Sequence, residues 1–297
     1  YAILPQHLKE SELVGGNGMV EMGTSVAILV GMMLGGWLVA QEGWGVTAAA
    51  FVTMGISATG FLLSRLIPLA PAAAPELTIN WNPLTETWRN FQFMRGNRTV
   101  FLSVLGISWF WFYGSIFITQ FPNLSKDILS GQESVVTLLL IVFSIGIGVG
   151  SLLCERLSGR KVEIGLVPFG SIGLTLFGID LYFALAAHLQ HEPMALAAFL
   201  QDASHWRILG DLFLIGLFGG FYIVPLYALI QIRSEPSHRS RIIAGNNILN
   251  ALFMVAAAGI AIGLFTAGVS IPQLLLVTAL MNAVVALYIY RLVPEFL

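Results

Sequence analysis

The chain has 297 residues, of which 57% are hydrophobic and only 10% charged, and its formal net charge is −2. A soluble domain carries about 25% charged residues, so a water-soluble globule of this length would lack the polar side chains to cover its surface. Its 14 basic residues lie between apolar segments and form no continuous basic face for nucleic acid. We therefore expect an integral membrane protein, neither a soluble enzyme nor a nucleic-acid-binding protein.

Apolar stretches long enough to cross a bilayer, which takes roughly 20 residues in a helix, recur along the whole chain. In chain order they cover residues 17–40, 45–67, 99–122, 134–154, 164–187, 208–231, 244–267 and 271–292. Each is continuously apolar, whereas the strands of a membrane β-barrel alternate apolar and polar residues. The sequence thus predicts an all-α bundle, and glycines such as Gly31, Gly35, Gly146 and Gly150 predict close helix packing.

Lysines and arginines are concentrated in every second loop. One set of loops carries Lys9, Arg65, Arg89, Arg95, Arg98, Arg156, Arg160, Lys161, Arg233, Arg239, Arg241 and Arg291, whereas the alternate loops carry only Lys126 and Arg207. Basic loops of membrane proteins stay in the cytoplasm. We therefore expect both Tyr1 and Leu297 on the cytoplasmic side.

The longest basic loop, residues 71–98, contains a helix signal of its own. Asn82 followed by Pro83 is typical of an N-cap and the first helical residue. Leu84, Trp88 and Phe91 then share one face, with arginines nearby. This pattern predicts a short amphipathic helix on the inner leaflet, close to anionic lipid.

Three short motifs occur twice in the same order. Tyr1–Leu4 recurs as Tyr227–Ile230, Gly15–Gly18 as Ala244–Asn247, and Ser64–Pro68 as Tyr290–Pro294. Two similar halves are typical of secondary transporters. Because four spans precede the final pair of the second copy, we expect four further spans before Tyr1. Residues 1–70 would then end a first six-helix half, 71–98 form the central cytoplasmic loop, and 99–297 form the second half.

The repeat, the basic central loop and the segment Gly150–Lys161 together resemble the major facilitator superfamily. That resemblance implies a bundle of six plus six helices, of which helices five to twelve are present. The charged residues Glu155, Arg156 and Arg160 belong to a degenerate form of that superfamily's loop motif, in which the spacing is usually shorter and the acid is Asp; the resemblance implies a role in gating.

Other segments resemble one branch, the lysophospholipid transporter family. These segments are Tyr1–Gln6, Glu12–Gly18, Val20–Thr24 and Ala27–Leu29. Two further segments, Gly106–Trp111 and Arg291–Phe296, are similar to transporter regions that are fused to an acyltransferase and an acyl-carrier-protein synthetase. The resemblance implies a flippase of the bacterial inner membrane that moves lysophospholipids, such as lysophosphatidylethanolamine, to the cytoplasmic leaflet for re-acylation. An acyltransferase, fused or separate, is then an expected partner. Stand-alone members carry an arginine in the seventh helix, but Thr99–Pro122 has no basic residue.

Polar residues inside the spans are the candidates for function, because they are costly in hydrocarbon. Asn17 and Glu21 lie one helical turn apart, and the repeat maps them to Asn246 and Asn250. Two interpretations stay open for this quartet. It forms a hydrogen-bonded clamp between helices that holds the bundle together or gates its cytoplasmic end, or it contacts substrate or a proton directly.

The cavity implied by the resemblance would be lined by the seventh and tenth helices of the superfamily. In the first of these, Trp109, Tyr113 and Gln120 recur at helical spacing, although an interfacial aromatic belt is the alternative for the aromatic residues. In the second, Asp211 and Tyr222 are candidates, with an ordinary interfacial position as the alternative for Asp211. We also assign Tyr1 to the cavity.

The chain lacks the usual catalytic signatures. It has no phosphate-binding glycine-rich loop with a lysine, no H-E-x-x-H and no nucleophile elbow, so we expect no enzyme activity and no cofactor. His188, His191 and His205 share a loop, but no rigid frame joins them, and we expect no metal site. Two other functions stay open, a drug or small-solute exporter on the same fold and a membrane anchor for a fused acyltransferase.

Overall fold

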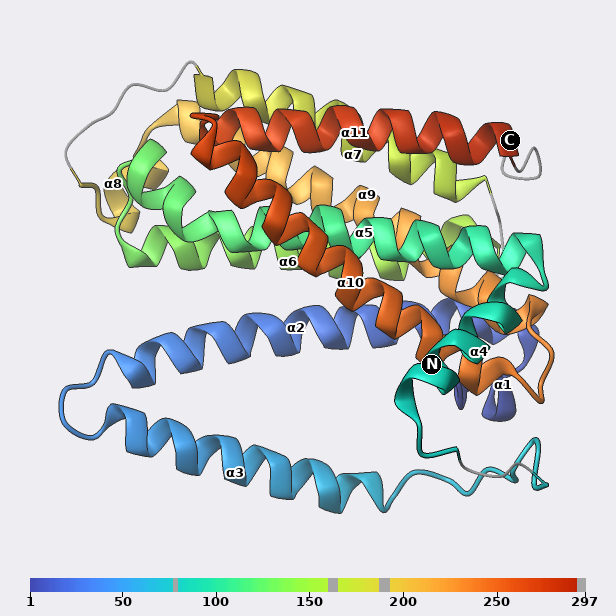
Figure 1. Cartoon of the computed structure of the whole chain (residues 1–297). Helices are drawn as coiled ribbons and strands as arrows, with labels where there is room; N and C mark the ends of the chain where they lie inside the picture. Colours follow the sequence, from blue (N-terminus) through green and yellow to red (C-terminus); the bar gives the residue numbers. More distant parts are fainter. Residues whose placement is uncertain (77–79, 160–164, 187–192, 293–297) are drawn as a thin grey trace.

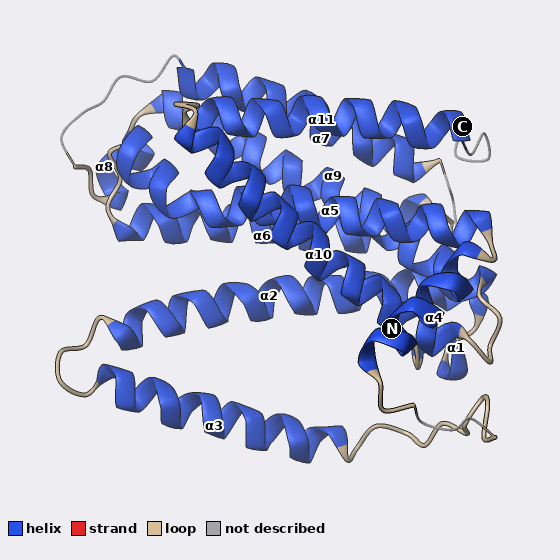
Figure 2. Ribbon diagram, in the orientation of Figure 1, coloured by secondary structure: helices blue, strands red, loops and turns tan. Residues whose placement is uncertain are grey.

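The computed structural model describes residues 1–76, 80–159, 165–186 and 193–292, and this part of the chain is built of helices (Figures 1 and 2). The helices are α1 (Leu4–His7), α2 (Leu13–Val39), α3 (Gly45–Ser64), α4 (Pro83–Arg95), α5 (Arg98–Asn123), α6 (Glu133–Leu157), α7 (Leu166–Ala186), α8 (Leu196–Gln201), α9 (Ala203–Arg233), α10 (Arg239–Thr266) and α11 (Ile271–Leu292). Within the described residues, 8 helices are long and apolar enough to cross a membrane. Each of them overlaps one of the eight predicted spans.

Several helices begin ahead of the predicted apolar stretches, and at one of them a polar cap accounts for the extension. The start of α9 shows this, because it lies at Ala203, ahead of the predicted residue 208. The Asp202 side chain accepts a hydrogen bond from the Ser204 backbone N–H at 2.8 Å and so caps the helix. A prediction from hydrophobicity alone does not detect such a cap and therefore places the start of the helix too late.

The helix α9 is the centre of the bundle and packs against α6 and α7. A methyl group on Gly146 would lie 2.2 Å from the carbonyl oxygen of Phe213, and one on Gly150 would lie 2.0 Å from that of Leu217. These glycines therefore allow α6 and α9 to approach backbone to backbone, as predicted. In contrast, nothing in the described structure lies within 4 Å of a methyl group built on Gly31 or Gly35 of α2.

The helix α2 lies along α6, whereas α3 turns back from α2 and diverges from it, so that Gly45, at its start, is its one buried residue (Figure 1). Apolar side chains of α3, such as Phe51 and Met54, are exposed. In a membrane protein such surface contacts lipid or other membrane helices, so its exposure costs nothing in hydrocarbon.

The predicted amphipathic helix is present as α4. The Asn82 side chain accepts hydrogen bonds from the backbone N–H groups of Leu84 at 3.1 Å and Thr85 at 3.2 Å, with Pro83 as the first helical residue. Leu84 and Trp88 are exposed, whereas Met94 is buried against Gly245 of α10. The position of α4 on the inner leaflet stays a prediction.

Both termini of the described chain and α4 lie toward one end of the bundle, whereas the α2–α3 turn and α8 lie toward the other (Figure 1). We call the first the basic end, because the described basic loops gather there; they carry Lys9, Arg65, Arg89, Arg95, Arg98, Arg156, Arg233, Arg239 and Arg241. The alternate loops that are rich in lysine and arginine in the sequence therefore lie together at one end of the bundle in the structure.

The orientation can be tested with thiol labelling, because Cys154 is fully buried. In a Cys154→Ser background, Glu42→Cys, in the α2–α3 turn, should react with a membrane-impermeant maleimide added to intact cells. Lys9→Cys, at the basic end, should react only after permeabilisation. The reverse labelling pattern would contradict the cytoplasmic assignment of the basic end.

Candidate functional site

A layer of polar and aromatic side chains joins α2 to α5, α9 and α10 toward the basic end. We call it the polar layer; it consists of Tyr1, Asn17, Glu21, Ser108, Tyr227, Gln231, Asn246 and Asn250. It brings together all four members of the predicted quartet. The contacts within it decide how the first spans are held against the rest of the bundle.

The amides of Asn17 and Gln231 form a reciprocal pair at the centre of this layer. Asn17 Nδ2 donates to Gln231 Oε1 at 2.6 Å, and Gln231 Nε2 donates to Asn17 Oδ1 at 3.0 Å. Gln231 Nε2 also donates to the carbonyl oxygen of Tyr1 at 3.1 Å. Both side chains are fully buried, so the pair satisfies polar groups that would otherwise be costly in this surrounding. Gln231 was not among the predicted residues, although it lies one turn after the repeat residue Tyr227.

The two tyrosines related by the repeat stack on one another. The ring centroids of Tyr1 and Tyr227 are 4.0 Å apart, with an interplanar angle of 5°. The Tyr1 hydroxyl donates to Glu21 Oε1. This arrangement ties the residue that precedes α1 both to α9 and to α2.

On α10, Asn246, Asn250 and Met254 follow at intervals of four residues and therefore share one face. Asn250 Oδ1 accepts a hydrogen bond from Ser108 Oγ at 2.9 Å. The Tyr227 phenol faces both asparagines. The Asn246 amide is buried, and neither its nitrogen nor its oxygen has a hydrogen-bond partner in the described part of the chain.

Close packing of α2 on α6 lies beside the polar layer. A methyl group on Gly15 would lie 2.6 Å from the Glu155 carboxyl carbon, and one on Gly18 would lie 2.7 Å from the carbonyl oxygen of Ser151. Glu155 is thus wedged against the start of α2. Arg156 is exposed, and the third predicted gating residue of this segment, Arg160, lies outside the described residues.

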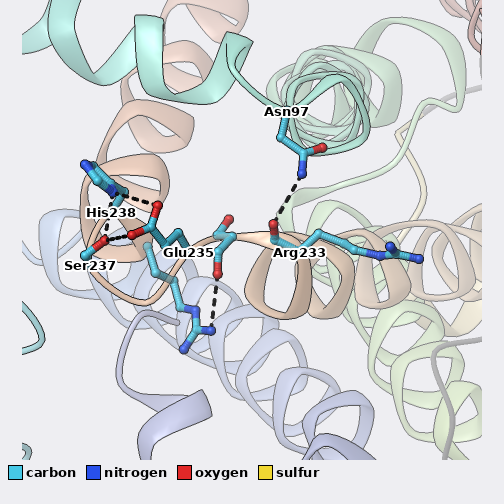
Figure 3. Close-up of polar contacts among 7 residues, drawn as sticks. Asn97, Arg233, Glu235, Ser237 and His238 are labelled. Atoms are coloured by element: carbon cyan, nitrogen blue, oxygen red, sulfur yellow. Dashed lines mark hydrogen bonds and ion pairs between the residues drawn. The ribbon is translucent and has the colours of Figure 1, made fainter.

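The junction of α4 and α5 is attached to the loop between α9 and α10 (Figure 3). Asn97 Nδ2 donates to the carbonyl oxygen of Arg233 at 3.4 Å. Within the loop, Ser237 Oγ donates to Glu235 Oε1 at 2.6 Å and lies 2.8 Å from His238 Nδ1. The His238 ring packs on Phe93 of α4, with centroids 4.2 Å apart. These contacts join the end of α4 to the loop between α9 and α10 at the basic end of the bundle.

A cavity of about 220 Å³ lies between α2, α5 and α6, next to the polar layer. Its walls are mainly apolar and aromatic, with small hydroxyl side chains among them; the lining residues are Glu21, Thr24, Ser25, Ile28, Phe110, Trp111, Gly114, Ser115, Ile118, Thr119, Phe143, Ser144, Ile147 and Met254. Glu21 belongs to both the polar layer and the cavity wall. It is the one carboxylate of the lining, which contains no basic side chain.

The residues predicted to line the cavity from α5 lie on the opposite face of that helix. Trp109 Nε1 donates to Asn282 Oδ1 of α11 at 2.8 Å, and the Tyr113 hydroxyl donates to the carbonyl oxygen of Leu174 of α7 at 2.9 Å. Gln120 shares this face by its spacing and is buried. Trp109 and Tyr113 therefore join α5 to α11 and α7, while Phe110, Trp111 and their neighbours face the cavity.

The candidates on α9 also lie outside the lining of this cavity. Tyr222 stacks on Phe110, with ring centroids 6.3 Å apart. Asp211 is buried beside an ion pair in which Arg207 Nε and Nη2 donate to the two oxygens of Asp180, at 3.0 and 2.5 Å. Arg207 is thus the partner of Asp180, and the sequence alone did not identify this pairing.

The predicted histidine loop is only partly described. His188 and His191 lie outside the described residues. His205 is buried, with its Nδ1 2.7 Å from the carbonyl oxygen of Phe199, and its ring stacks on that of Phe199. This histidine therefore has a packing role at the start of α9.

The amide pair of the polar layer predicts a measurable coupling. In the purified protein, Asn17→Ala or Gln231→Ala should each lower the free energy of unfolding by about 1–3 kcal/mol, because each leaves the other amide buried and unpaired. The double variant should lower the free energy of unfolding by less than the sum of the two single losses. Asn247→Ala, an exposed amide on α10, serves as the control; additive losses for the pair would contradict the assigned contact.

Comparison with known proteins places the chain in a family. Lysophospholipid transporter LplT of Klebsiella pneumoniae subsp. pneumoniae is 30% identical over 273 residues, which are 91% of this chain and 62% of the relative. Proteins with the same name from Serratia proteamaculans and Enterobacter sp. are 29% and 30% identical, covering 80% and 79% of this chain and 54% of each relative. The chain thus spans between about half and two thirds of the length of these curated relatives.

No solved structure matches the chain significantly. The family model described as Major Facilitator Superfamily matches residues 1–201. Because this match covers more than half of the chain, the protein belongs to the major facilitator superfamily.

Proposed function

We propose that the intact protein is a secondary transporter that moves lysophospholipids across the bacterial inner membrane to the cytoplasmic leaflet. The observation that carries the proposal is similarity along almost the whole chain to relatives that bear the name lysophospholipid transporter. The basic end is the cytoplasmic end in this proposal, in accordance with the placement of lysine and arginine.

The chemistry of the cavity supports an amphiphilic substrate. Ile28, Ile118 and Ile147 give it apolar walls that suit a single acyl chain, while Glu21 gives one wall a charge. A small polar solute would find few partners on such walls, whereas a lipid with one chain and a headgroup finds both kinds of surface.

The polar layer supports a mechanism in which two halves rock about the substrate. It joins α2 to the second half toward the basic end, and the cavity lies farther along the same faces of α2 and α10, where Ile28 and Met254 follow Glu21 and Asn250. Opening toward the basic end requires the amide pair and the tyrosine stack to separate. The layer is thus the cytoplasmic gate, and its contacts set the free-energy difference between the two states.

An acyltransferase on the cytoplasmic side is the partner that this direction of transport calls for. A lysophospholipid delivered to that leaflet carries a free hydroxyl, and esterification of this hydroxyl restores a two-chain lipid. Re-acylation would remove lysophospholipid from the cytoplasmic leaflet and thereby favour net transport toward that leaflet.

Filling the cavity tests the proposal directly. Gly114 lines the cavity, and nothing lies within 4 Å of a methyl group built on it, so Gly114→Leu should fold normally and reduce uptake of labelled lysophosphatidylethanolamine by about tenfold or more. Gly210→Leu on α9 is the matched control, because it also meets open space but lies outside the cavity lining.

Uptake is measured in membranes that lack the native transporter, with the intact protein supplied. If the protein moves no lysophospholipid, the substrate assignment fails while the fold stands. If Gly114→Leu transports as well as Gly210→Leu, the cavity is not the substrate path. Movement of small amphiphilic drugs without lysophospholipid would instead favour an exporter.

A further inference from the structure

Glu21 is a buried acid without a basic partner. It is 2% exposed, and no nitrogen of a lysine, arginine or histidine lies within 4.0 Å of its carboxylate among the described residues. The Tyr1 hydroxyl donates to Oε1, which leaves Oε2 for another group. A carboxylate in an apolar surrounding is costly unless a cation or a proton accompanies it.

The surroundings of Glu21 suit a cation that carries apolar groups. The cavity wall next to it includes the aromatic rings of Phe110 and Trp111. Behind Glu21 stand the stacked rings of Tyr1 and Tyr227. Aromatic faces attract ammonium groups, and a desolvated site strengthens that attraction. A carboxylate beside aromatic rings is thus a site for an amine, either primary or quaternary.

We propose that Glu21 binds the ammonium group of an amine-bearing lysophospholipid headgroup, with the acyl chain in the apolar part of the cavity. This inference rests on the proposed function and specifies its substrate class. The ammonium group pairs with Glu21 Oε2. The headgroup thereby reaches the polar layer, and the Tyr1 hydroxyl keeps its contact with the other carboxylate oxygen.

The phosphate of such a headgroup finds neutral donors and no cation. Trp111 Nε1 and Asn246 Nδ2 are buried N–H groups that face the Tyr227 hydroxyl and form no well-aligned hydrogen bond in the described residues. The helix α5 has no basic residue between Thr99 and Pro122, and the cavity lining has none either. A zwitterionic headgroup, with its ammonium on Glu21, therefore fits better than a headgroup whose only charge is negative.

Three lysophospholipids with the same acyl chain test the inference. Lysophosphatidylethanolamine and lysophosphatidylcholine carry an ammonium group, whereas lysophosphatidylglycerol does not. The wild-type protein should take up both amine lipids faster than lysophosphatidylglycerol. Glu21→Gln should reduce uptake of the amine lipids by about tenfold, as expected for loss of a charge-assisted contact worth ~1.4 kcal/mol, and should reduce uptake of lysophosphatidylglycerol by a clearly smaller factor.

The Glu21→Gln substitution tests the charge of this side chain separately from its hydrogen bond. A glutamine at position 21 still accepts a hydrogen bond from Tyr1, so the gate contact is kept while the charge is removed. Glu133→Gln, an exposed acid at the start of α6, is the control for acid-to-amide substitution. Glu21→Gln also imitates a protonated glutamic acid, so full uptake of lysophosphatidylethanolamine by this variant would overturn the inference in favour of a proton.

A second measurement uses the wild-type protein alone. Dodecyltrimethylammonium, below its micellar concentration, should compete with lysophosphatidylethanolamine uptake more strongly than dodecyl sulfate does. Equal competition by the two detergents, or equal uptake of all three lipids, would overturn the amine assignment while lysophospholipid transport stands. Failure of the wild-type protein to move any of the lipids would overturn the proposed function and this inference together.

Discussion

The attachment of α2 to the rest of the bundle depends on a buried set of hydrogen bonds. Hydrocarbon gives helices no hydrophobic reason to associate, so small residues and polar contacts must hold them together. Here Gly15 and Gly18 allow α2 to approach α6, and the Asn17–Gln231 amide pair connects it to α9. Asn17 and Glu21 lie one turn apart on α2, so the helix face that carries this amide pair also provides a wall of the cavity.

A contact made of hydrogen bonds and one aromatic stack is well suited to a gate. Each bond contributes about 1 kcal/mol net, and the stack adds about as much again. The sum is large enough to favour one state and small enough to be offset by substrate binding. A gate of packed leucines would gain little from closing in hydrocarbon, because lipid tails are equally good neighbours.

The sequence predicted the spans, the helix at Pro83 and the quartet of polar residues, because each is a local pattern of hydrophobicity, capping or repetition. It did not predict which face of α5 lines the cavity. The reason is physical: both faces of this helix are apolar, since one packs on α7 and α11 and the other meets the cavity. Gln231 and Arg207 were also missed as partners, because contacts between distant segments leave no periodic signal.

The stacking of Tyr1 on Tyr227 places two equivalent residues of the repeat face to face, as in a two-fold dimer whose subunits meet through the same patch. Two equivalent halves would by themselves give the cavity similar walls on both sides. Glu21 and Asn250 are equivalent positions as well, yet only the first is an acid. Glu21 lines the cavity and Asn250 does not, so the carboxyl group lies on one wall only. In the proposed transport cycle, a substrate with a charged headgroup would therefore bind in one orientation.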